Sequence, residues 1–247
     1  MNRTGTDPVA AVRGAAEDYV FSWLDGDRAR MDGCLHPALA KRALADPTGA
    51  RIDLFDLSKD QMIERASVPK PFGRDVQIDV QAIDEDIASA SVRSEPFLDL
   101  LHLGRFGERW LIVNALWAET PLRPATPQAE AGVRAALADY AVFPFARDVE
   151  RARRCHHPDL RERRAITPGA SDLALEETTL EEVLAIAESG FDEEPSSREA
   201  TTDILDLTAG MASARIDVAW FRIHLHLAAF ADGWRIVNIL YRTKGDG

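Results

Sequence analysis

Residues 97–117 read FLDLLHLGRFGERWLIVNALW, and residues 221–241 read FRIHLHLAAFADGWRIVNILY. Each stretch consists of two apolar runs around a short turn-forming segment, GER at 107–109 in the first and ADG at 231–233 in the second. Apolar runs separated by such a turn predict a β-hairpin. The same hairpin therefore occurs twice, at an offset of 124 residues (221 − 97 = 124).

The repeat continues on the N-terminal side of both hairpins, at an offset of 121 residues (140 − 19 = 121). The additional residues of the second copy fall in a turn-forming loop, which tolerates insertion. We predict two copies of one domain, residues 7–119 (copy one) and 127–243 (copy two), joined by a Pro-rich linker at 120–126. Identical residues at this offset include Tyr19 and Tyr140, Asp27 and Asp148, Cys34 and Cys155, His36-Pro37 and His157-Pro158, Leu39 and Leu160, and Arg42 and Arg163.

Helical patterns open each copy. Between residues 9 and 23, apolar side chains recur at three- and four-residue intervals, which predicts an amphipathic helix. Gly26 ends this helix, and Asp27 is placed to cap a second, shorter one. In copy two, Pro144 falls inside the first helix and should kink it or end it early.

A third helix and a series of strands follow. Ser58 with Gln61, and Thr179 with Glu182, have the spacing of a capping box, which opens a helix. Residues 76–83, 88–94, 97–106 and 110–117 of copy one are predicted strands separated by turns. Helices followed by an antiparallel meander predict an α+β fold in which the helices pack on one face of the sheet.

Composition narrows the class of protein. The formal net charge of −12 argues against a nucleic-acid partner, because phosphate binding requires a basic face. The start, MNRTGTDPVA, lacks the apolar segment of a signal peptide, and no run approaches the roughly 18 apolar residues of a membrane span. We therefore expect a cytoplasmic protein without a membrane partner. Cys34 and Cys155 occupy equivalent positions and are interpreted as one small buried residue duplicated, not as a disulfide.

These residues resemble the nuclear transport factor 2-like superfamily, and within it the "putative lumazine-binding" and SnoaL-like branches. The resemblance covers nearly the whole chain, twice. Copy two departs from it at Pro144, Phe145 and Ile223, where copy one has Trp23, Leu24 and Asp99. In copy one it rests on Tyr19, Trp23, Asp27, His36-Pro37, DLLHL at 99–103 and WLIVN at 110–114.

The resemblance implies two cone-shaped domains, each a curved antiparallel sheet wrapped by helices, with a cavity at the wide end. Such domains often pair through their sheets, so a tandem copy implies an intramolecular pseudo-dimer, and we expect a monomer in solution. Members of the superfamily include ketosteroid isomerases, scytalone dehydratases, polyketide cyclases, epoxide hydrolases and many binding modules. The fold alone therefore does not decide the function.

Three residues of copy one are candidates for acid–base catalysis. His102 lies in the middle of a predicted strand and titrates near neutral pH, although a structural, hydrogen-bonded histidine is the competing interpretation. Asp99 is replaced by an apolar residue in copy two, and it is either an acid or base or an outward polar residue. Tyr19, on the apolar face of the first helix, either polarises a substrate carbonyl or packs in the core.

Other residues are candidates for ligand binding. Trp23 and Trp117 could form a flat aromatic wall against a planar ligand, or pack in the core. Tyr140 is the counterpart of Tyr19 in copy two. His36-Pro37 follows a predicted helix end, where capping of the helix C-terminus competes with a role in a site.

The histidines of copy two raise the question of a metal. His224 and His226 project from the same face of one strand, and with His157 they could supply three imidazole ligands to zinc. No carboxylate or thiol has an evident complementary position, so no metal is predicted. No Gly-rich phosphate loop follows a strand, so no nucleotide cofactor is expected either.

Three functions stay open. The first is a binding protein that holds a small apolar or planar ligand in a cone cavity. The second is a cofactor-independent enzyme of the isomerase, dehydratase, cyclase or hydrolase type that uses Asp, His and Tyr. The third is a non-catalytic interaction protein whose cavities are filled. We expect copy one to hold the more ligand-like pocket, because Trp23, Asp99 and Trp117 accompany His102 there.

Overall fold

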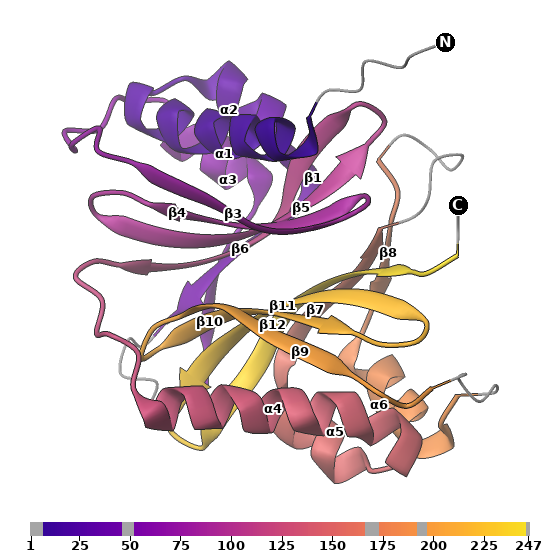
Figure 1. Cartoon of the computed structure of the whole chain (residues 1–247). Helices are drawn as coiled ribbons and strands as arrows, with labels where there is room; N and C mark the ends of the chain where they lie inside the picture. The colour runs from indigo at the N-terminus through magenta and orange to yellow at the C-terminus, as the bar shows by residue number, and fades with distance from the viewer. Residues whose placement is uncertain (1–6, 46–51, 166–172, 192–196, 246–247) are drawn as a thin grey trace. The chain divides into compact units, whose positions relative to one another are not determined.

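The computed structural model describes residues 7–45, 52–165, 173–191 and 197–245 (Figure 1). The chain divides into two compact units, and in the linker the division falls between Pro121 and Leu122. The described part of each copy contains three helices and a six-stranded sheet, in the same order along the chain. The protein is thus a tandem repeat of one α+β domain.

The elements of the two copies correspond one to one. Copy one contains α1 (Pro8–Asp25), α2 (Arg28–Cys34), β1 (Leu35–Leu44), β2 (Leu54–Leu57), α3 (Lys59–Arg65), β3 (Gln77–Asp84), β4 (Ile87–Arg93), β5 (Phe97–Phe106) and β6 (Arg109–Glu119). Copy two contains α4 (Pro127–Ala146), α5 (Val149–Cys155), β7 (His156–Ala165), β8 (Leu175–Thr178), α6 (Leu180–Ser189), β9 (Thr201–Leu207), β10 (Met211–Asp217), β11 (Phe221–Phe230) and β12 (Gly233–Thr243).

Both sheets have the same topology. The strand order is β2-β1-β6-β5-β4-β3 in copy one and β8-β7-β12-β11-β10-β9 in copy two. The predicted hairpins are β5–β6 and β11–β12, both antiparallel, whereas β1 joins β6 and β7 joins β12 in parallel. In each copy the helices lie against one face of the sheet (Figure 1). The α+β prediction is therefore confirmed.

Local sequence explains where the helices begin and end. Gly26 follows α1 in a left-handed conformation (φ 74°), which glycine adopts without strain. Asp27 caps α2 as predicted, because its side chain accepts a hydrogen bond from the backbone N of Arg30 at 3.0 Å. Both capping boxes are present, at Ser58 for α3 and at Thr179 for α6.

Of the two effects predicted for Pro144, an early end of the first helix of copy two does not occur, whereas a kink stays a prediction. Helix α4 continues through Pro144 to Ala146. A proline disrupts a helix by removing one donor and by crowding the preceding turn. Here only two further residues of the helix follow it, so little helix depends on that turn, and Pro144 is buried in the wall of a cavity.

Strands β1 and β7 were not among the predicted elements. The segment LHPALAKRAL of β1 contains no β-branched residue, and HHPDLRERRA of β7 is strongly charged. Both compositions are unfavourable for strands when judged locally. The pairing with β6 and β12 compensates for this, with Lys41 beside Ala115 and Glu162 beside Ile239.

A β-bulge recurs at the same place in β6 and β12. The cross-strand pairing skips Val113 in β6 and Val237 in β12. Ile112 and Ala115 consequently both face the helix-side core, although they are three residues apart. One extra residue in a strand produces this change of alternation.

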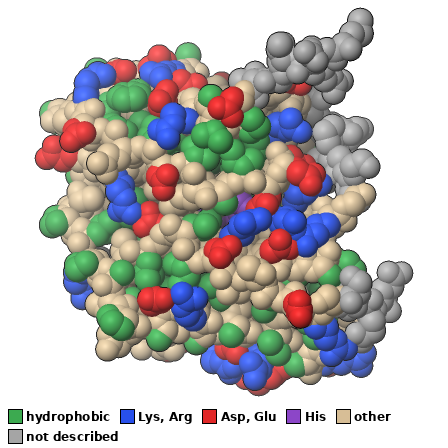
Figure 2. Space-filling model, viewed as in Figure 1, with side chains coloured by type: hydrophobic (Ala, Val, Ile, Leu, Met, Phe, Trp, Pro, Cys, Tyr) green, Lys and Arg blue, Asp and Glu red, His purple; other side chains and the backbone are tan. Residues whose placement is uncertain are grey.

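The two cysteines are buried free thiols, as predicted. Within the described ranges, no helix has both the length and the apolar character needed to cross a membrane. On the face shown in Figure 2, acidic and basic side chains are interspersed and do not gather into a large area of one sign.

Candidate functional site

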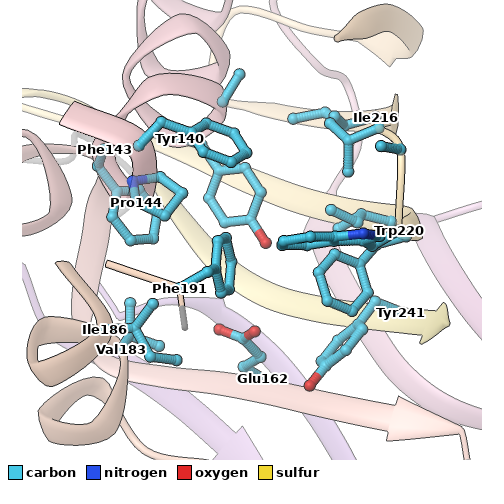
Figure 3. A pocket seen from close by; sticks show the side chains of 16 residues that line it. Tyr140, Phe143, Pro144, Glu162, Val183, Ile186, Phe191, Ile216, Trp220 and Tyr241 are labelled. Atoms are coloured by element: carbon cyan, nitrogen blue, oxygen red, sulfur yellow. The ribbon is translucent and has the colours of Figure 1, made fainter. Parts of the chain in front are cut away.

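A cavity of about 150 Å³ lies among α4, α6 and the sheet of copy two (Figure 3). An engineered cavity of about this volume in another protein is large enough to hold benzene. The wall is almost entirely apolar and belongs to copy two alone. The lining residues are Tyr140, Ala141, Phe143, Pro144, Phe145, Glu162, Val183, Ile186, Phe191, Ile216, Val218, Ala219, Trp220, Phe221, Ile223 and Tyr241.

Aromatic rings form much of the wall and support one another. Phe191 meets Trp220 edge to face, with ring centroids 5.2 Å apart and an interplanar angle of 84°. Phe221 meets Tyr241 in the same way, at 5.5 Å and 88°. Edge-to-face packing is the favoured arrangement of neighbouring rings. These contacts fix the rings in different orientations, so that a ligand would meet several ring faces and edges at once.

Glu162 is the one acidic residue among the lining residues. It lies on β7 next to Arg163, which is buried and pairs with Glu177 on the adjacent strand. Because side chains alternate along a strand, Glu162 points to the opposite face, and Figure 3 shows its carboxyl group directed into the cavity. Oε2 of Glu162 is buried, and no described group forms a hydrogen bond with it.

Burial in these apolar surroundings raises the pKa of Glu162 to about 8. Burial has this effect because a low-dielectric environment disfavours the charged form of a carboxyl group. Near neutral pH the group is thus mostly protonated, and it can donate a hydrogen bond. A modest rise in pH, or a cation placed beside it, would convert it to a carboxylate.

Two phenols accompany Glu162. Burial raises the pKa of Tyr140 well above its usual value, and the negative charge of Glu162 raises it further. Burial, followed by the charge of Glu162, raises the pKa of Tyr241 to about 12. Both hydroxyls therefore stay protonated in the physiological pH range. The Tyr241 hydroxyl forms a hydrogen bond with Thr178, so the cavity combines apolar walls with one titratable carboxyl group and the hydroxyl of Tyr140.

In copy one, a cation takes the place of this carboxyl group. At the repeat offsets, Tyr19, Lys41, Asp99 and Trp117 correspond to Tyr140, Glu162, Ile223 and Tyr241. Lys41 forms an ion pair with Asp99, and the exposed fractions of the two side chains are only 8% and 7%. Tyr19 joins them, since its hydroxyl donates to Asp99 Oδ1 at 2.8 Å and accepts from Lys41 Nζ at 2.5 Å.

The Lys41 ammonium also lies close to two aromatic residues. Its Nζ is 5.0 Å from the ring centroid of Trp117, which is within the range of cation–π attraction. It is 5.2 Å from the ring centroid of Tyr19, but it meets that residue at the hydroxyl and not over the ring face. Burial lowers the pKa of Lys41, and the charge of Asp99 opposes that effect. In copy one, therefore, a cation, its carboxylate partner and two aromatic rings are all supplied by the chain itself.

The family model described as Putative lumazine-binding matches residues 7–118 and, a second time, residues 128–242. The chain belongs to the putative lumazine-binding family. The resemblance inferred from the sequence is thereby confirmed, and so is its occurrence as a tandem repeat. No curated protein matches this chain.

Solved structures similar to this chain each match about one copy. A protein of unknown function from Silicibacter pomeroyi DSS-3, described as NTF-2 like, is 19% identical over 45% of this chain and 95% of its own, with a TM-score of 0.39. A similar protein from Shewanella baltica OS155 is 14% identical, over 49% and 99%, with a TM-score of 0.38. A ketosteroid isomerase-like protein from Erwinia carotovora atroseptica SCRI1043 is 15% identical, over 47% and 99%, with a TM-score of 0.34.

The structure brings together two of the three predicted catalytic residues. Tyr19 and Asp99 lie side by side, although they are joined there by Lys41, which was not predicted. His102 is elsewhere. Its neighbours Leu101 and Leu103 belong to the helix-side core, so His102 faces the opposite side of the sheet. There its Nδ1 lies 3.3 Å from Nδ2 of Asn114.

A third ring, Phe97, contacts both Trp23 and Trp117. Phe97 meets Trp23 at 6.4 Å and 68°, and it meets Trp117 at 5.2 Å and 89°. Each indole thus packs edge to face against Phe97, and the flat wall for a planar ligand stays a prediction. Tyr140, in contrast, lies in the wall of the copy-two cavity.

The remaining predicted histidines lie outside the cavity. His224 and His226 are buried and alternate with Ile223 and Leu225, which belong to the helix-side core, so both imidazoles face away from it. Burial, followed by the neighbouring His224, lowers the pKa of His226 to about 3. Within the described residues, no three His, Cys, Asp or Glu side chains gather closely enough to hold a metal.

His36 is part of strand β1 and does not cap the end of α2. The helix ends at Cys34, and the imidazole Nδ1 of His36 accepts a hydrogen bond from the backbone N of Ala38 at 3.1 Å. Its ring packs on Phe106, with centroids 4.7 Å apart. His157 repeats this arrangement in β7. The expected capping role is therefore wrong, because the chain becomes extended immediately after Cys34.

Sequence reasoning missed most of the cavity wall, including Trp220 and Tyr241. It also missed Lys41 and Glu162, which lie in strands with no local strand signal, so that their position in a core could not be foreseen. One signal was available. Leu39 and Arg42 are identical in the two copies, but between them a lysine of copy one corresponds to a glutamate of copy two. A charge reversal inside a matched segment indicates that the two copies differ at a site.

Proposed function

We propose that this protein binds a small apolar molecule, about the size of one aromatic ring, in the cavity of copy two. The observation that carries the proposal is the cavity itself, about 150 Å³ with an aromatic and aliphatic wall. Ligand sites are typically concave and mostly apolar, with a few polar groups that orient the ligand. Glu162 and Tyr140 supply the polar groups here.

A matched pair of substitutions on α4 tests the proposal. Ala141 lines the cavity, so Ala141→Phe places a ring inside it. Ala138, three residues earlier on the same helix, is exposed, and Ala138→Phe is the control. Ligand-observed NMR with a set of single-ring aromatic compounds measures binding. We expect binding to the wild type and to Ala138→Phe, and loss of binding in Ala141→Phe. Equal binding by all three proteins would place the ligand elsewhere and overturn the proposal.

Native mass spectrometry of the gently purified protein provides a second test. A co-purifying small molecule should be detected as it is released from the wild type, and it should be absent from Ala141→Phe. Its mass would also identify the ligand class directly. A well-folded wild type that neither carries a ligand nor binds any single-ring compound would refute a binding function for the cavity.

A second candidate function is cofactor-independent acid–base catalysis in the same cavity. It is favoured by the pKa of Glu162, about 8, because a general base works best when its pKa is near the working pH. The Glu162 carboxylate would remove a proton from the carbon beside a ligand carbonyl. The hydroxyl of Tyr140 would donate a hydrogen bond to the resulting enolate oxygen.

Hydrogen–deuterium exchange at the methyl group of acetophenone tests this second function. In D2O the protein should accelerate the exchange, and the rate should rise with pH up to about 8 as Glu162 ionises. Glu162→Gln should abolish the acceleration. Glu188→Gln, which removes an exposed carboxylate on α6, should preserve it. Ligand binding without any accelerated exchange would leave the binding function in place and exclude this reaction.

A further inference from the structure

The two copies arrange charge differently around one conserved feature, a pair of aromatic rings. In copy one, Tyr19 and Trp117 lie near the Lys41 ammonium, and Asp99 neutralises it. In copy two, Tyr140 and Tyr241 occupy the equivalent positions of the rings, and both line the cavity. A carboxyl group is present there too, from Glu162, but no lysine, arginine or histidine belongs to the described lining.

We propose that the copy-two cavity selects a small organic cation, an ammonium compound of about one-ring size, which occupies the position that the Lys41 ammonium has in copy one. The inference rests on the proposed function, since it names the class of the ligand bound in that cavity. Copy one serves as an internal template. It establishes that this domain accommodates an ammonium between the tyrosine of its first helix and the aromatic residue of its last strand.

The wall of the cavity has the chemistry that recognises such a cation. Ammonium groups are attracted to the faces of Trp, Tyr and Phe rings within about 6 Å, and aromatic cages use this attraction to bind quaternary ammonium ligands. Six partly exposed rings line the cavity, so a cation would meet aromatic surface in several directions. They are Tyr140, Phe145, Phe191, Trp220, Phe221 and Tyr241.

Glu162 supplies the opposite charge. Its Oε2 is buried and has no hydrogen-bond partner in the described part of the chain, and the carboxyl group points into the cavity (Figure 3). A buried carboxylate is stable only when a partner compensates its charge. An anionic ligand would instead meet this carboxyl group with no basic residue beside it. The charge arrangement thus favours a cation over an anion.

The other titratable groups around Glu162 do not provide the missing partner. Tyr140 on α4 and Tyr241 on β12 stay protonated because burial raises the pKa of each. Arg164, two residues along β7, pairs through Nη2 with Glu176 on β8 at 2.5 Å, and its buried Nε forms no hydrogen bond with Glu162. Helix α6 and the connection between β10 and β11 contribute only apolar lining residues. Burial alone shifts the pKa of Glu162.

The test compares two isosteric probes. Phenyltrimethylammonium carries a permanent positive charge, and tert-butylbenzene has the same shape without charge. Titration calorimetry at pH 9, where Glu162 is ionised, should show the cation binding at least about tenfold more tightly. Below pH 8 the affinity for the cation should fall by about tenfold per pH unit, because binding then requires the release of a proton. The affinity for tert-butylbenzene should not fall in this way.

Substitution of the carboxyl group provides the second measurement. Glu162→Gln should weaken binding of phenyltrimethylammonium by about tenfold or more and remove its pH dependence. Binding of tert-butylbenzene by the same variant reports that the cavity is intact. Glu188→Gln is the matched control and should bind both probes like the wild type, since Glu188 is exposed on α6.

The outcomes separate this inference from the proposed function. If tert-butylbenzene and acetophenone bind while phenyltrimethylammonium does not, the cavity binds ligands but the cation inference is wrong. The inference also fails if Glu162→Gln binds the cation as tightly as the wild type does. If none of the three probes binds the folded wild type, both the inference and the proposed function are overturned.

Discussion

Replacement of Glu162 by glutamine should make copy two more stable at alkaline pH and change it little at acidic pH. In the unfolded chain a glutamate titrates near 4.5, whereas burial raises the pKa of Glu162 in the fold to about 8. Between these values the folded state keeps a proton that the unfolded state releases. The contribution of this proton to the free energy of unfolding is fully present below pH 4.5 and is lost as the pH rises through 8.

The size of the effect follows from the same two values. A difference of one pH unit corresponds to about 1.4 kcal/mol, so the full range from 4.5 to about 8 is worth at most about 5 kcal/mol. Water that enters the cavity solvates the carboxylate and reduces this value. We expect Glu162→Gln to exceed the wild type in unfolding free energy by about 2–4 kcal/mol at pH 8.5. At pH 5 the two proteins should differ by less than about 1 kcal/mol.

The assay must distinguish the two copies. Urea unfolding at a series of pH values, read by pulsed hydrogen exchange and mass spectrometry, follows peptides from β11–β12 and β5–β6 separately. Only the copy-two peptides should respond to Glu162→Gln, and Glu188→Gln should have no pH-dependent effect on either set. An advantage of Glu162→Gln that stays constant with pH, or that is largest at pH 5, would refute the reasoning.

Three further predictions concern the rest of the chain. Asp99→Ile, which gives copy one the residue of copy two, should cost about 3–5 kcal/mol because it leaves a buried ammonium unpaired, and adding Lys41→Met should recover most of that loss in urea unfolding. Gly132→Ala should lower the melting temperature, because a Cβ there would lie 2.3 Å from Cδ1 of Trp234 and force the indole to move. We expect a cost of about 1–3 kcal/mol in the free energy of unfolding, and an unchanged melting temperature would contradict this. Light scattering should give the mass of a monomer, 27.3 kDa, and twice that mass would refute the expectation.

The helices and the closing hairpins could be predicted from sequence because their signals are local. The capping boxes at Ser58 and Thr179 involve residues only three apart, and the hairpins follow from alternation around a turn. The duplication strengthened both, since each signal occurs twice. The family resemblance followed from the same residues.

The candidate site could not be predicted because its wall combines residues that are distant in the sequence, such as Tyr140 and Tyr241. The equivalent cluster of copy one shows the same difficulty. Tyr19 and Asp99 are 80 residues apart there, and nothing local indicates that Lys41 lies between them. The sequence favoured copy one as the site of the pocket, yet the cavity described above lies in copy two. Lys41 and Asp99 occupy the interior of copy one as a buried ion pair. Copy two has a single carboxyl group and an isoleucine at those positions.

The bulge at Val237 determines which residues at the end of β12 face the cavity. If β12 kept all its residues but paired without the bulge, the alternation after Val237 would be reversed, and Tyr241 would leave the cavity while its neighbour Leu240 entered. Deleting Val237 would instead restore regular alternation and keep Ile239 and Tyr241 on the cavity side. The register of a single strand, as much as residue identity, sets what this domain can recognise.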